Sequence, residues 1–422
     1  MTAVKRFLLS NKKIRQFAKK ILPQKLHEFL KQHFLFKPVK KRKVFQYDNN
    51  LTQGVNIIGI VRSGKSIGAQ ARLIAKALEA AGIPYCMIDL CDYFNCSKNN
   101  LEFEHKISNQ QIYNVNLIVL NADCIHRTLV MLNRNEMNKR YNIGYWAWEL
   151  AEFPDIWIPG FNCLQEVWTF SKFCANSIAE KSPVPVLSIP LFADNSNANI
   201  NNGRGYFNLP QDVFLFMVAY DCDSFAERKN PQAAVKAFMN AFPPEDQRVG
   251  LILKIFSPEN YQSHINELLK KLSEYKNIYY FDKYLSDEEM KTLISASDTF
   301  ISLHRAEGFG LIPLEAMALG TPVVSTAWSG NMEYMNNNNA ALTGYTMVPV
   351  NGQYLGTTPG EDYVWAEPDI EEASGLMKRL VLDKEWREKL IKNGKDTATN
   401  NFNADIMGNR IRKRLKTLSL LN

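Results

Sequence analysis

Short apolar runs alternate with amphipathic segments along most of the chain. In the first half, residues 55–61 form an apolar run typical of a buried strand, and residues 71–84 form an amphipathic helix that Gly82 and Pro84 close. Further strand candidates are residues 85–90, 116–123, 142–150, 166–170 and 184–191. Strands that alternate with helices predict a domain built on a parallel sheet.

The same pattern begins again after residues 192–212, a polar, Asn-rich stretch typical of a linker. Residues 213–220 predict the first strand of this second half, and the helix after it has Pro231 in its first turn. Later strands are predicted at 250–256, 277–282, 299–304 and 321–326, with helices at 286–297 and 311–320. The fold class is therefore α/β, with two Rossmann-like parallel domains facing a cleft.

The predicted organisation has five parts. They are an arm at 1–50, a first domain at 51–195, a linker at 196–210, a second domain at 211–382, and C-terminal helices at 383–422 that can cross back to the first domain. Seven cysteines are an odd number, and they lie mostly in or beside apolar stretches. This favours free thiols in a reducing compartment over a disulfide framework.

The net charge of +7 comes from the arm. Residues 1–50 contain fourteen Lys or Arg residues and two acids, so the remaining chain is net negative. This excludes a nucleic-acid-binding body. Within the arm, Ile14, Phe17, Ala18 and Ile21 recur at helical spacing with lysines on the other face. Such a basic amphipathic helix either lies on an anionic membrane surface or packs on the protein as a solvated arm.

The first residues lack the long apolar core of a signal peptide, and no run reaches transmembrane length. The expected location is the cytoplasm, with association to the cytoplasmic face of a membrane left open. Oligomeric state is not fixed by anything in the sequence.

Residues Gly59 to Ser66 match the formal pattern of a phosphate-binding P-loop, G-x-x-x-x-G-K-S. Gly59 stands inside the apolar run, however, so we expect the strand to continue through Ile60 and Val61 and the turn to start at Arg62. A loop that lines the crevice between the domains is the favoured interpretation, and a P-loop ATPase or kinase is the alternative.

Residues 302–335, "SLHRAEGFGLIPLEAMALGTPVVSTAWSGNMEYM", carry the strongest chemical signal. Glu307 and Glu315 are eight positions apart, and Gly308 and Gly310 form a turn at the start of a predicted helix. A helix N-terminus preceded by glycines offers amides to a pyrophosphate, and a carboxylate can accept both hydroxyls of a ribose. The alternative is a structural corner with two surface glutamates.

This segment closely resembles glycosyltransferase family 4, whose members are retaining enzymes of GT-B fold. Further matching stretches are "YWAWELAEFP", "EVWTFSKF", "VPVLSIPL", "ERKNPQAAVKAF", "LILKIF" and "YVWAEPD". The resemblance runs from about Asn56 to about Ala373, leaves out the arm, and is typical of bacterial enzymes of surface-polysaccharide assembly. It implies a nucleotide-sugar donor on the second domain and a glycan or lipid-linked acceptor on the first.

The resemblance also implies roles for particular residues. Glu307 would contact the donor sugar and Glu315 the ribose, while Lys229 would neutralise the diphosphate. An arginine is frequent five residues before that lysine, but Ser224 stands there, so Arg228 is the candidate for a second cation. The positions expected near the sugar and phosphates are Gly308, Phe309, Gly310 and Leu311.

In the first half, the loop with Ser63 and Gly64 would face the donor diphosphate and the acceptor. His126 follows a strand end, where some family members have a histidine near the sugar, and Asp123 is a weaker candidate. Glu149, among tryptophans that include Trp146, fits an acceptor site because aromatic faces stack on sugars. Ordinary core packing explains the tryptophans equally well.

No metal or other cofactor is expected. Asp221 and Asp223 form a D-x-D pattern, which binds Mn²⁺ or Mg²⁺ in a different glycosyltransferase fold but is not needed in this one. Because no nucleophile is evident, retention would proceed by front-side attack, with the leaving phosphate taking the acceptor proton. The remaining alternatives are a non-catalytic GT-B protein that binds nucleotide sugars, which the serine at 224 motivates, and a membrane-recruited scaffold, which the basic arm motivates.

Overall fold

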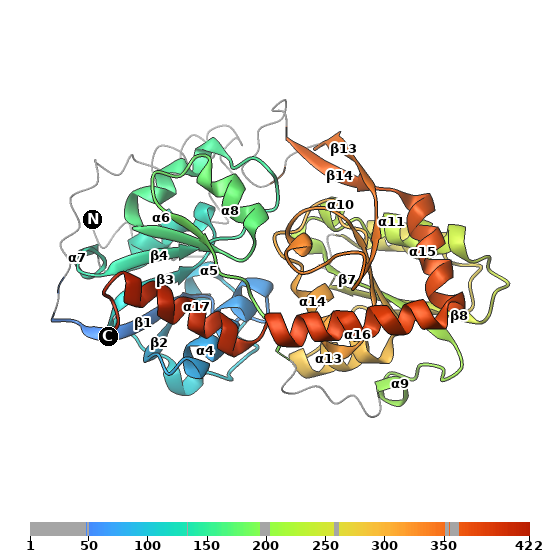
Figure 1. Cartoon of the computed structure of the whole chain (residues 1–422), viewed down its shortest axis with the longest axis horizontal. Coiled ribbons are helices and arrows are strands. Elements are labelled where there is room, and N and C mark those ends of the chain that lie inside the picture. The colour runs from blue at the N-terminus through green and yellow to red at the C-terminus, as the bar shows by residue number, and fades with distance from the viewer. Residues whose placement is uncertain are drawn as a thin grey trace.

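The computed structural model describes residues 48, 50–132, 134–194, 203–256, 261–350, 354 and 363–422. Two parallel α/β domains lie side by side, each with a six-stranded sheet (Figure 1). The basic arm predicted at residues 1–50 lies outside the described residues except for its last positions. No helix in the described part of the chain combines the length and the apolar character needed to cross a membrane.

The first domain has the strand order β2-β1-β3-β4-β5-β6, and every neighbouring pair is parallel. Its strands are β1 (Thr52–Gly59), β2 (Tyr85–Asp89), β3 (Tyr113–Val119), β4 (Tyr141–Tyr145), β5 (Glu166–Thr169) and β6 (Val186–Ser188). Its helices are α4 (Ser66–Ala80), α5 (Cys91–Phe94), η2 (Glu104–Lys106), α6 (Ala122–Met131), α7 (Arg134–Asn138), η3 (Asp155–Cys163) and α8 (Lys172–Ala179).

The second domain has the strand order β12-β11-β10-β7-β8-β9, again parallel throughout. Its strands are β7 (Phe214–Asp221), β8 (Val249–Phe256), β9 (Ile278–Phe281), β10 (Thr299–Ser302), β11 (Val323–Thr326) and β12 (Ala341–Thr343), and β13 (Tyr345–Pro349) and β14 (Val364–Pro368) form a separate ribbon. Its helices are α9 (Gly203–Tyr206), η5 (Cys222–Ser224), α10 (Ala226–Lys229), α11 (Pro231–Ala241), α12 (Gln262–Lys271), α13 (Asp287–Ala296), α14 (Leu311–Leu319), η7 (Gly330–Glu333) and α15 (Ile370–Leu382).

The strands are mostly apolar because helices cover both faces of each sheet, although they also contain buried polar residues such as Asn116 and Glu166. In β7, Leu215 and Met217 join one core cluster, whereas Phe216 and Val218 join the cluster on the opposite face. Several predicted strand bounds differ from the structure; the strand predicted at 142–150, for example, ends at Tyr145, and the one predicted at 116–123 ends at Val119. β1 ends at Gly59 rather than at Val61, because the Ser63 amide donates to the Ile60 carbonyl and turns the chain.

The C-terminal helices connect the two domains. Helix α16 (Lys384–Asn401) packs on α14, and α17 (Ala404–Thr417) packs on α4 of the first domain (Figure 1). Gly408 permits this close approach, since a Cβ there would lie 2.2 Å from the carbonyl oxygen of Ala77. The C-terminal helices thus cross from the second domain to the first domain, where the described chain begins.

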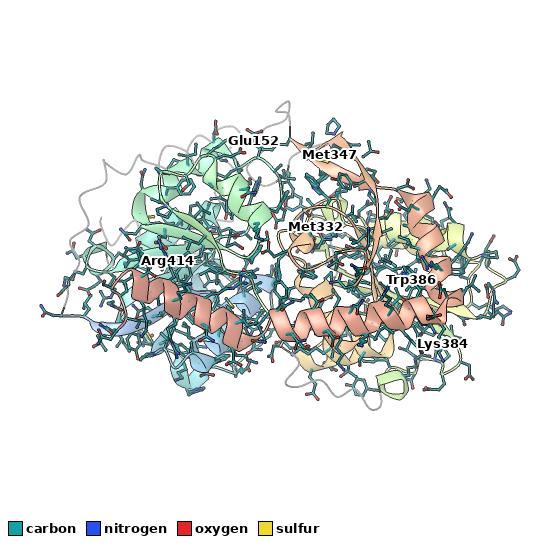
Figure 2. All side chains as sticks on the ribbon, in the orientation of Figure 1. Glu152, Met332, Met347, Lys384, Trp386 and Arg414 are labelled. Carbon is teal, nitrogen blue, oxygen red and sulfur yellow. The ribbon has the colours of Figure 1, made fainter. Side chains whose placement is uncertain are left out.

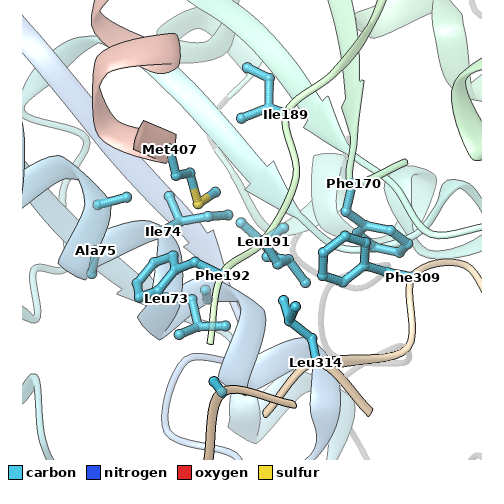
Figure 3. Close-up of a cluster of buried hydrophobic side chains, with 14 of the residues drawn as sticks. Leu73, Ile74, Ala75, Phe170, Ile189, Leu191, Phe192, Phe309, Leu314 and Met407 are labelled. Atoms are coloured by element: carbon cyan, nitrogen blue, oxygen red, sulfur yellow. The ribbon is translucent and has the colours of Figure 1, made fainter. Parts of the chain in front are cut away.

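A single apolar cluster continues from one domain into the other. Figure 3 shows Ile74 of α4 and Phe170 of the first domain close to Leu191 of the connecting segment and to Phe309 and Leu314 of the second domain. The rings of Phe170 and Phe309 have centroids 6.1 Å apart. This shared core fixes how the two domains face each other.

An ion pair also links helix α17 to the first domain. Arg414 of α17, labelled in Figure 2, donates from both Nε and Nη2 to the fully buried carboxylate of Glu166. Tyr141 and Trp168 donate to the same carboxylate. Removing one partner of a buried ion pair leaves an uncompensated charge, which is more costly than the pair itself is favourable.

We therefore expect Arg414→Met to lower the free energy of unfolding by roughly 3 kcal/mol. Chemical denaturation measures this loss, and Lys413→Met, an exposed neighbour on the same helix, is the matched control. Adding Glu166→Gln to Arg414→Met should recover part of the loss. A double variant as unstable as the sum of the single variants would contradict the pairing.

Candidate functional site

The topology places a crevice where the two domains meet. In each sheet the strand order reverses direction beside the first strand, between β1 and β3 in the first domain and between β7 and β10 in the second. Ligands of open parallel sheets bind outside the carboxyl ends of the strands at such a switch point. A ligand site is therefore expected at the loops after β1, β7 and β10.

These loops line a cavity of about 680 Å³ between the domains. The first domain contributes the loop after β1 with Gly64, helix α4, and the residues after β4 with Glu149. The second contributes the segments after β7 and β10, with Lys229, Glu307 and Glu315 on its wall. The cavity thus collects side chains that are more than 80 positions apart in the sequence.

Helix α10 positions two cations at the carboxyl end of β7. This four-residue helix lies between Phe225 and Asn230, which have φ values of +60° and +51°. A positive φ is costly for a bulky residue such as phenylalanine, and Asn tolerates it better. The turn is secured because the Arg305 amide donates to the Arg228 carbonyl across a distance of 2.8 Å. The strained turn presents Arg228 and Lys229 toward the segment after β10.

Glu307 lies between these two cations. The Lys229 ammonium donates to Oε1 of Glu307, and Nη1 of Arg228 is 3.4 Å from Oε2. Arg228 is buried and also donates to the carbonyl oxygens of Ala306 and Ser224, at 2.7 and 3.2 Å. These bonds hold Arg228 behind Glu307, so Lys229, which is more exposed, is the cation nearer the open cavity.

The charges of this cluster follow from its burial and its partners. Burial by itself would raise the pKa of Glu307, but Lys229 and then Arg228 outweigh it and lower the pKa to about 2. Burial lowers the pKa of Lys229, although Glu307 opposes this effect. Glu307 is therefore a carboxylate at any physiological pH, and it is paired with both cations.

The chain turns sharply from Glu307 into α14. Gly310 has φ +80° and precedes Leu311, the first residue of the helix. Among the described residues, none accepts a hydrogen bond from the amides of Gly308, Phe309 or Gly310. These amides lie beside the positive end of the helix dipole, an arrangement that suits an anion. The Phe309 side chain, in contrast, belongs to the core between the domains.

Glu315 lies on α14 and is half-buried on the cavity wall. Burial raises its pKa to about 8, and Lys291 opposes this only in part because Asp287 and Asp194 act in the same direction as burial. The two glutamates of the motif therefore differ in charge at neutral pH. A neutral carboxyl group can both donate and accept a hydrogen bond, which also matches a pair of hydroxyls.

The loop after β1 is not built as a phosphate cradle. Nη1 of Arg72 donates to the carbonyl oxygens of Val61 and Ser63, at 3.1 and 2.8 Å, and so occupies the inside of the turn. The Ser63 amide is used within the turn, and the Lys65 amide donates to Oγ of Ser63. The inside of the turn is therefore filled by the Arg72 guanidinium, whereas Gly64 to Ile67 line the cavity.

Three predicted positions do not line the cavity. Ser63 is fully buried under Arg72, and Trp146 is fully buried among the rings of Phe153 and Phe161. Asp123 lies at the start of α6 with a pKa raised by burial. Core packing therefore accounts for Trp146, as its alternative interpretation held. His126 is also on α6, but its side chain lies outside what the structure describes.

The remaining predicted positions are on the cavity wall. They are Gly64, Glu149, Ser224, Arg228, Lys229, Glu307, Gly308, Phe309, Gly310, Leu311 and Glu315. Asp221 lines it as well, whereas the side chain of Asp223 lies outside the described part of the chain. A group of three or more His, Cys, Asp or Glu side chains able to hold a metal is not found among the described residues.

Sequence reasoning missed Tyr354 and His304. The Tyr354 hydroxyl donates to Oε2 of Glu149 at 2.8 Å and joins the two domains above Arg228. No spacing or motif marked this tyrosine. His304 is buried, and its Nε2 lies 3.2 Å from both the Trp328 carbonyl and the Asn331 side chain, so it supports the turn beneath Glu307. The sequence feature that could have identified His304 is its position three residues before Glu307.

The raised pKa of Glu315 predicts a pH-dependent stability. The folded state holds this proton up to about pH 8, whereas the unfolded chain releases it near pH 4.5, so the group destabilises the fold progressively as pH rises through that window. We expect Glu315→Gln to raise the melting temperature relative to the wild type at pH 9 more than at pH 5. Glu385→Gln, an exposed change, is the control, and an equal difference at both pH values would contradict the assignment.

The comparisons with known proteins agree with this geometry. Residues 222–356 match the family model described as "Glycosyl transferases group 1". Alpha-1,3/1,6-mannosyltransferase ALG2 of Candida albicans is 29% identical over 122 residues, which are 28% of this chain and 24% of that protein. The matches span less than half the length of the curated relatives.

Solved structures cover more of the chain. HepE of Anabaena in complex with UDP and glucose has a TM-score of 0.62 and 16% identity, covering 86% of this chain and 99% of that one. Sucrose-phosphate synthase of Thermosynechococcus elongatus has a TM-score of 0.64 and 15% identity, covering 87% and 99%. The chain thus has the GT-B fold, and the match of residues 222–356 to the group 1 glycosyl transferases agrees with the resemblance to glycosyltransferase family 4.

Proposed function

We propose that this protein is a retaining glycosyltransferase that moves a sugar from a nucleotide-diphosphate sugar to a glycan or lipid-linked acceptor in surface-polysaccharide synthesis. The observation that carries the proposal is the pair of carboxylates on one cavity wall. Glu307 is held between two cations, and Glu315 lies eight residues further along on the helix that starts between them. The UDP and glucose bound to the structurally similar HepE support a donor of this class.

In this proposal Lys229 and the amides at the start of α14 bind the diphosphate. The leaving nucleotide diphosphate gains negative charge in the transition state, and fixed positive groups beside it stabilise that state more than the ground state. Lys229 is already desolvated and paired with Glu307, so it exchanges one anionic partner for another as the donor enters. Arg228 stays behind Glu307 and keeps that carboxylate ionised and in place.

Glu307 and Glu315 would orient the two sugars of the donor. Glu307 would accept hydrogen bonds from hydroxyls of the transferred sugar, next to the bond that breaks. Glu315 would bind the two hydroxyls of the ribose. The acceptor would enter from the first domain, near Glu149. Its hydroxyl oxygen would form the new bond to the anomeric carbon on the face that the phosphate leaves, and the departing phosphate oxygen would take the hydroxyl proton.

We propose further that the reaction needs no metal or other cofactor. Lys229 and the α14 amides supply the positive charge that a divalent ion supplies in metal-dependent transferases. Transfer that persists in the presence of EDTA would support this.

A second candidate is a protein that binds nucleotide sugars without transferring them. Ser224 stands where the family often has an arginine, and the Arg228 side chain is bound to backbone carbonyls instead of facing the cavity. Tight donor binding together with neither transfer nor slow donor hydrolysis would favour this candidate.

Stabilisation by ATP alone, in a thermal-shift screen that also contains UDP-, GDP- and dTDP-sugars, would favour an ATPase or kinase.

We expect Glu307→Gln to reduce sugar transfer at least ~100-fold, because one lost interaction in an oxyanion-type site has this magnitude. The amide keeps the shape of the side chain but leaves Arg228 and Lys229 without their carboxylate, so the variant should be less stable, and transfer is measured where circular dichroism shows that it is folded. Transfer is measured on a panel of donors, with Glu385→Gln as the control that retains full activity. Undiminished transfer by Glu307→Gln would contradict the assignment.

Lys229→Met should weaken binding of the free nucleoside diphosphate by roughly 10-fold to 100-fold, the effect of losing one hydrogen bond to a charged group. Isothermal titration calorimetry measures the dissociation constant, and Lys389→Met on the exposed face of α16 is the matched control. An unchanged dissociation constant would remove Lys229 from the diphosphate site.

We also propose that the basic segment at residues 1–45 contacts an anionic membrane surface. Its support is the sequence alone, in which lysines and apolar residues occupy opposite faces of a helical pattern. Deleting residues 1–45 should reduce sedimentation with phosphatidylglycerol vesicles and leave sedimentation with phosphatidylcholine vesicles unchanged. Equal partition of both proteins onto the anionic vesicles would show that the arm is structural only.

A further inference from the structure

Lys254 is a fully buried lysine whose ammonium group has no hydrogen-bond partner among the described residues. It lies in β8, and its Nζ is 3.5 Å from the centre of the Phe256 ring. A cation–π contact of this kind contributes only about 1 to 2 kcal/mol and satisfies none of the three N–H groups directionally. Burying an ammonium in this way is costly unless an acceptor reaches it.

The ammonium lies directly behind the cavity wall. Lys254 and Phe256 are two positions apart on one strand, so their side chains are on the same face of the sheet. In the neighbouring strands, Lys254 pairs with Ala219 of β7 and with Phe281 of β9. Ala219, Phe256 and Asp282, the residue after Phe281, all line the cavity. The side chain thus runs along the strand toward the carboxyl edge, where the cavity opens.

The amine is a hydrogen-bond donor at neutral pH. Burial lowers the pKa of Lys254 to about 8, and the nearby carboxylates of Asp282 and Asp221 oppose this effect. Most molecules are therefore protonated at pH 7. The group can donate to an uncharged oxygen of a ligand without any change in its own charge.

Its position relative to the other site residues indicates which part of a donor it meets, and this step rests on the proposed function. Glu307 follows β10, and Lys229 follows β7, the neighbouring strand, while β8 is one strand further on. Two strand spacings separate the Glu307 end from Lys254, which is about 10 Å. Glu315 lies near Asp287 and Lys291 of α13, and the loop into α13 starts at Asp282, beside Lys254. A donor that has its diphosphate at Lys229 and its ribose at Glu315 therefore extends its base toward the ends of β8 and β9.

We propose that Lys254 recognises the nucleobase of the donor by donating a hydrogen bond to a ring carbonyl oxygen. Uracil, thymine and guanine carry such an oxygen, and adenine does not. The interaction would select UDP-, dTDP- or GDP-sugars against ADP-sugars, because adenine has an amino group, itself a donor, where guanine has its ring carbonyl oxygen.

The test compares nucleoside diphosphates on the full-length wild type and on Lys254→Met by isothermal titration calorimetry. We expect the variant to bind the tightest of UDP, dTDP and GDP at least ~10-fold more weakly, the effect of one hydrogen bond to a charged group. Its affinity for ADP and for inorganic pyrophosphate should be unchanged. Lys276→Met, an exposed lysine just before β9, should leave every affinity unchanged.

Two results would overturn the inference. One is an unaltered preference among the bases in Lys254→Met, and the other is an equal loss for all ligands including pyrophosphate, which would indicate a structural role only. If the variant does not fold, the wild type alone decides the matter. It should bind inosine diphosphate at least ~10-fold more tightly than the diphosphate of purine riboside, which lacks only the carbonyl edge. Equal affinities for these two would overturn the role of Lys254 and leave the proposed function intact, whereas no binding of any nucleoside diphosphate would overturn both.

Discussion

The close contact between the two domains at Gly308 is the constraint on which the site depends. Oγ of Ser171, in the first domain, donates to the Gly308 carbonyl at 2.6 Å, and a Cβ on Gly308 would lie 2.6 Å from the Phe170 ring. Gly330 of the second domain also contacts this backbone closely, since a Cβ there would be 1.9 Å from the Gly308 carbonyl oxygen. The backbone after Glu307 is therefore fixed from both domains, and the carboxylate is fixed with it.

The cluster around Glu307 holds an ammonium group in position for an anionic ligand. Three ionised side chains are held in a buried position, where their mutual attraction has to offset a large cost of desolvation. Arg228 is held in place by backbone carbonyls, whereas Lys229, among the described residues, pairs with Glu307 and faces the cavity. An entering diphosphate would meet an ammonium that is already dehydrated and already in place, so little reorganisation is needed.

The two glutamates of the motif show how environment separates identical residues. Two adjacent cations lower the pKa of the buried Glu307 to about 2, whereas burial, opposed by one lysine, raises the pKa of the half-buried Glu315 to about 8. One helix start lies between them. A site with one permanent carboxylate and one neutral carboxyl group can bind the two sugars of a donor differently. The spacing of the two glutamates along the sequence does not reveal this difference in charge.

The sequence determined the alternation of strands and helices, the two-domain fold and the importance of the segment around Glu307, because these depend on local periodicity and on residues close together in the chain. Tertiary structure decided which side chains actually meet. It placed Arg228 behind Glu307, filled the turn after β1 with Arg72, and buried Trp146 in the core. It also brought Tyr354 to Glu149 and left Lys254 behind the cavity wall, with no acceptor for its ammonium group in the part of the chain that the structure describes. Such contacts join residues far apart in the chain, and their energies depend on burial and on partners that no local pattern contains.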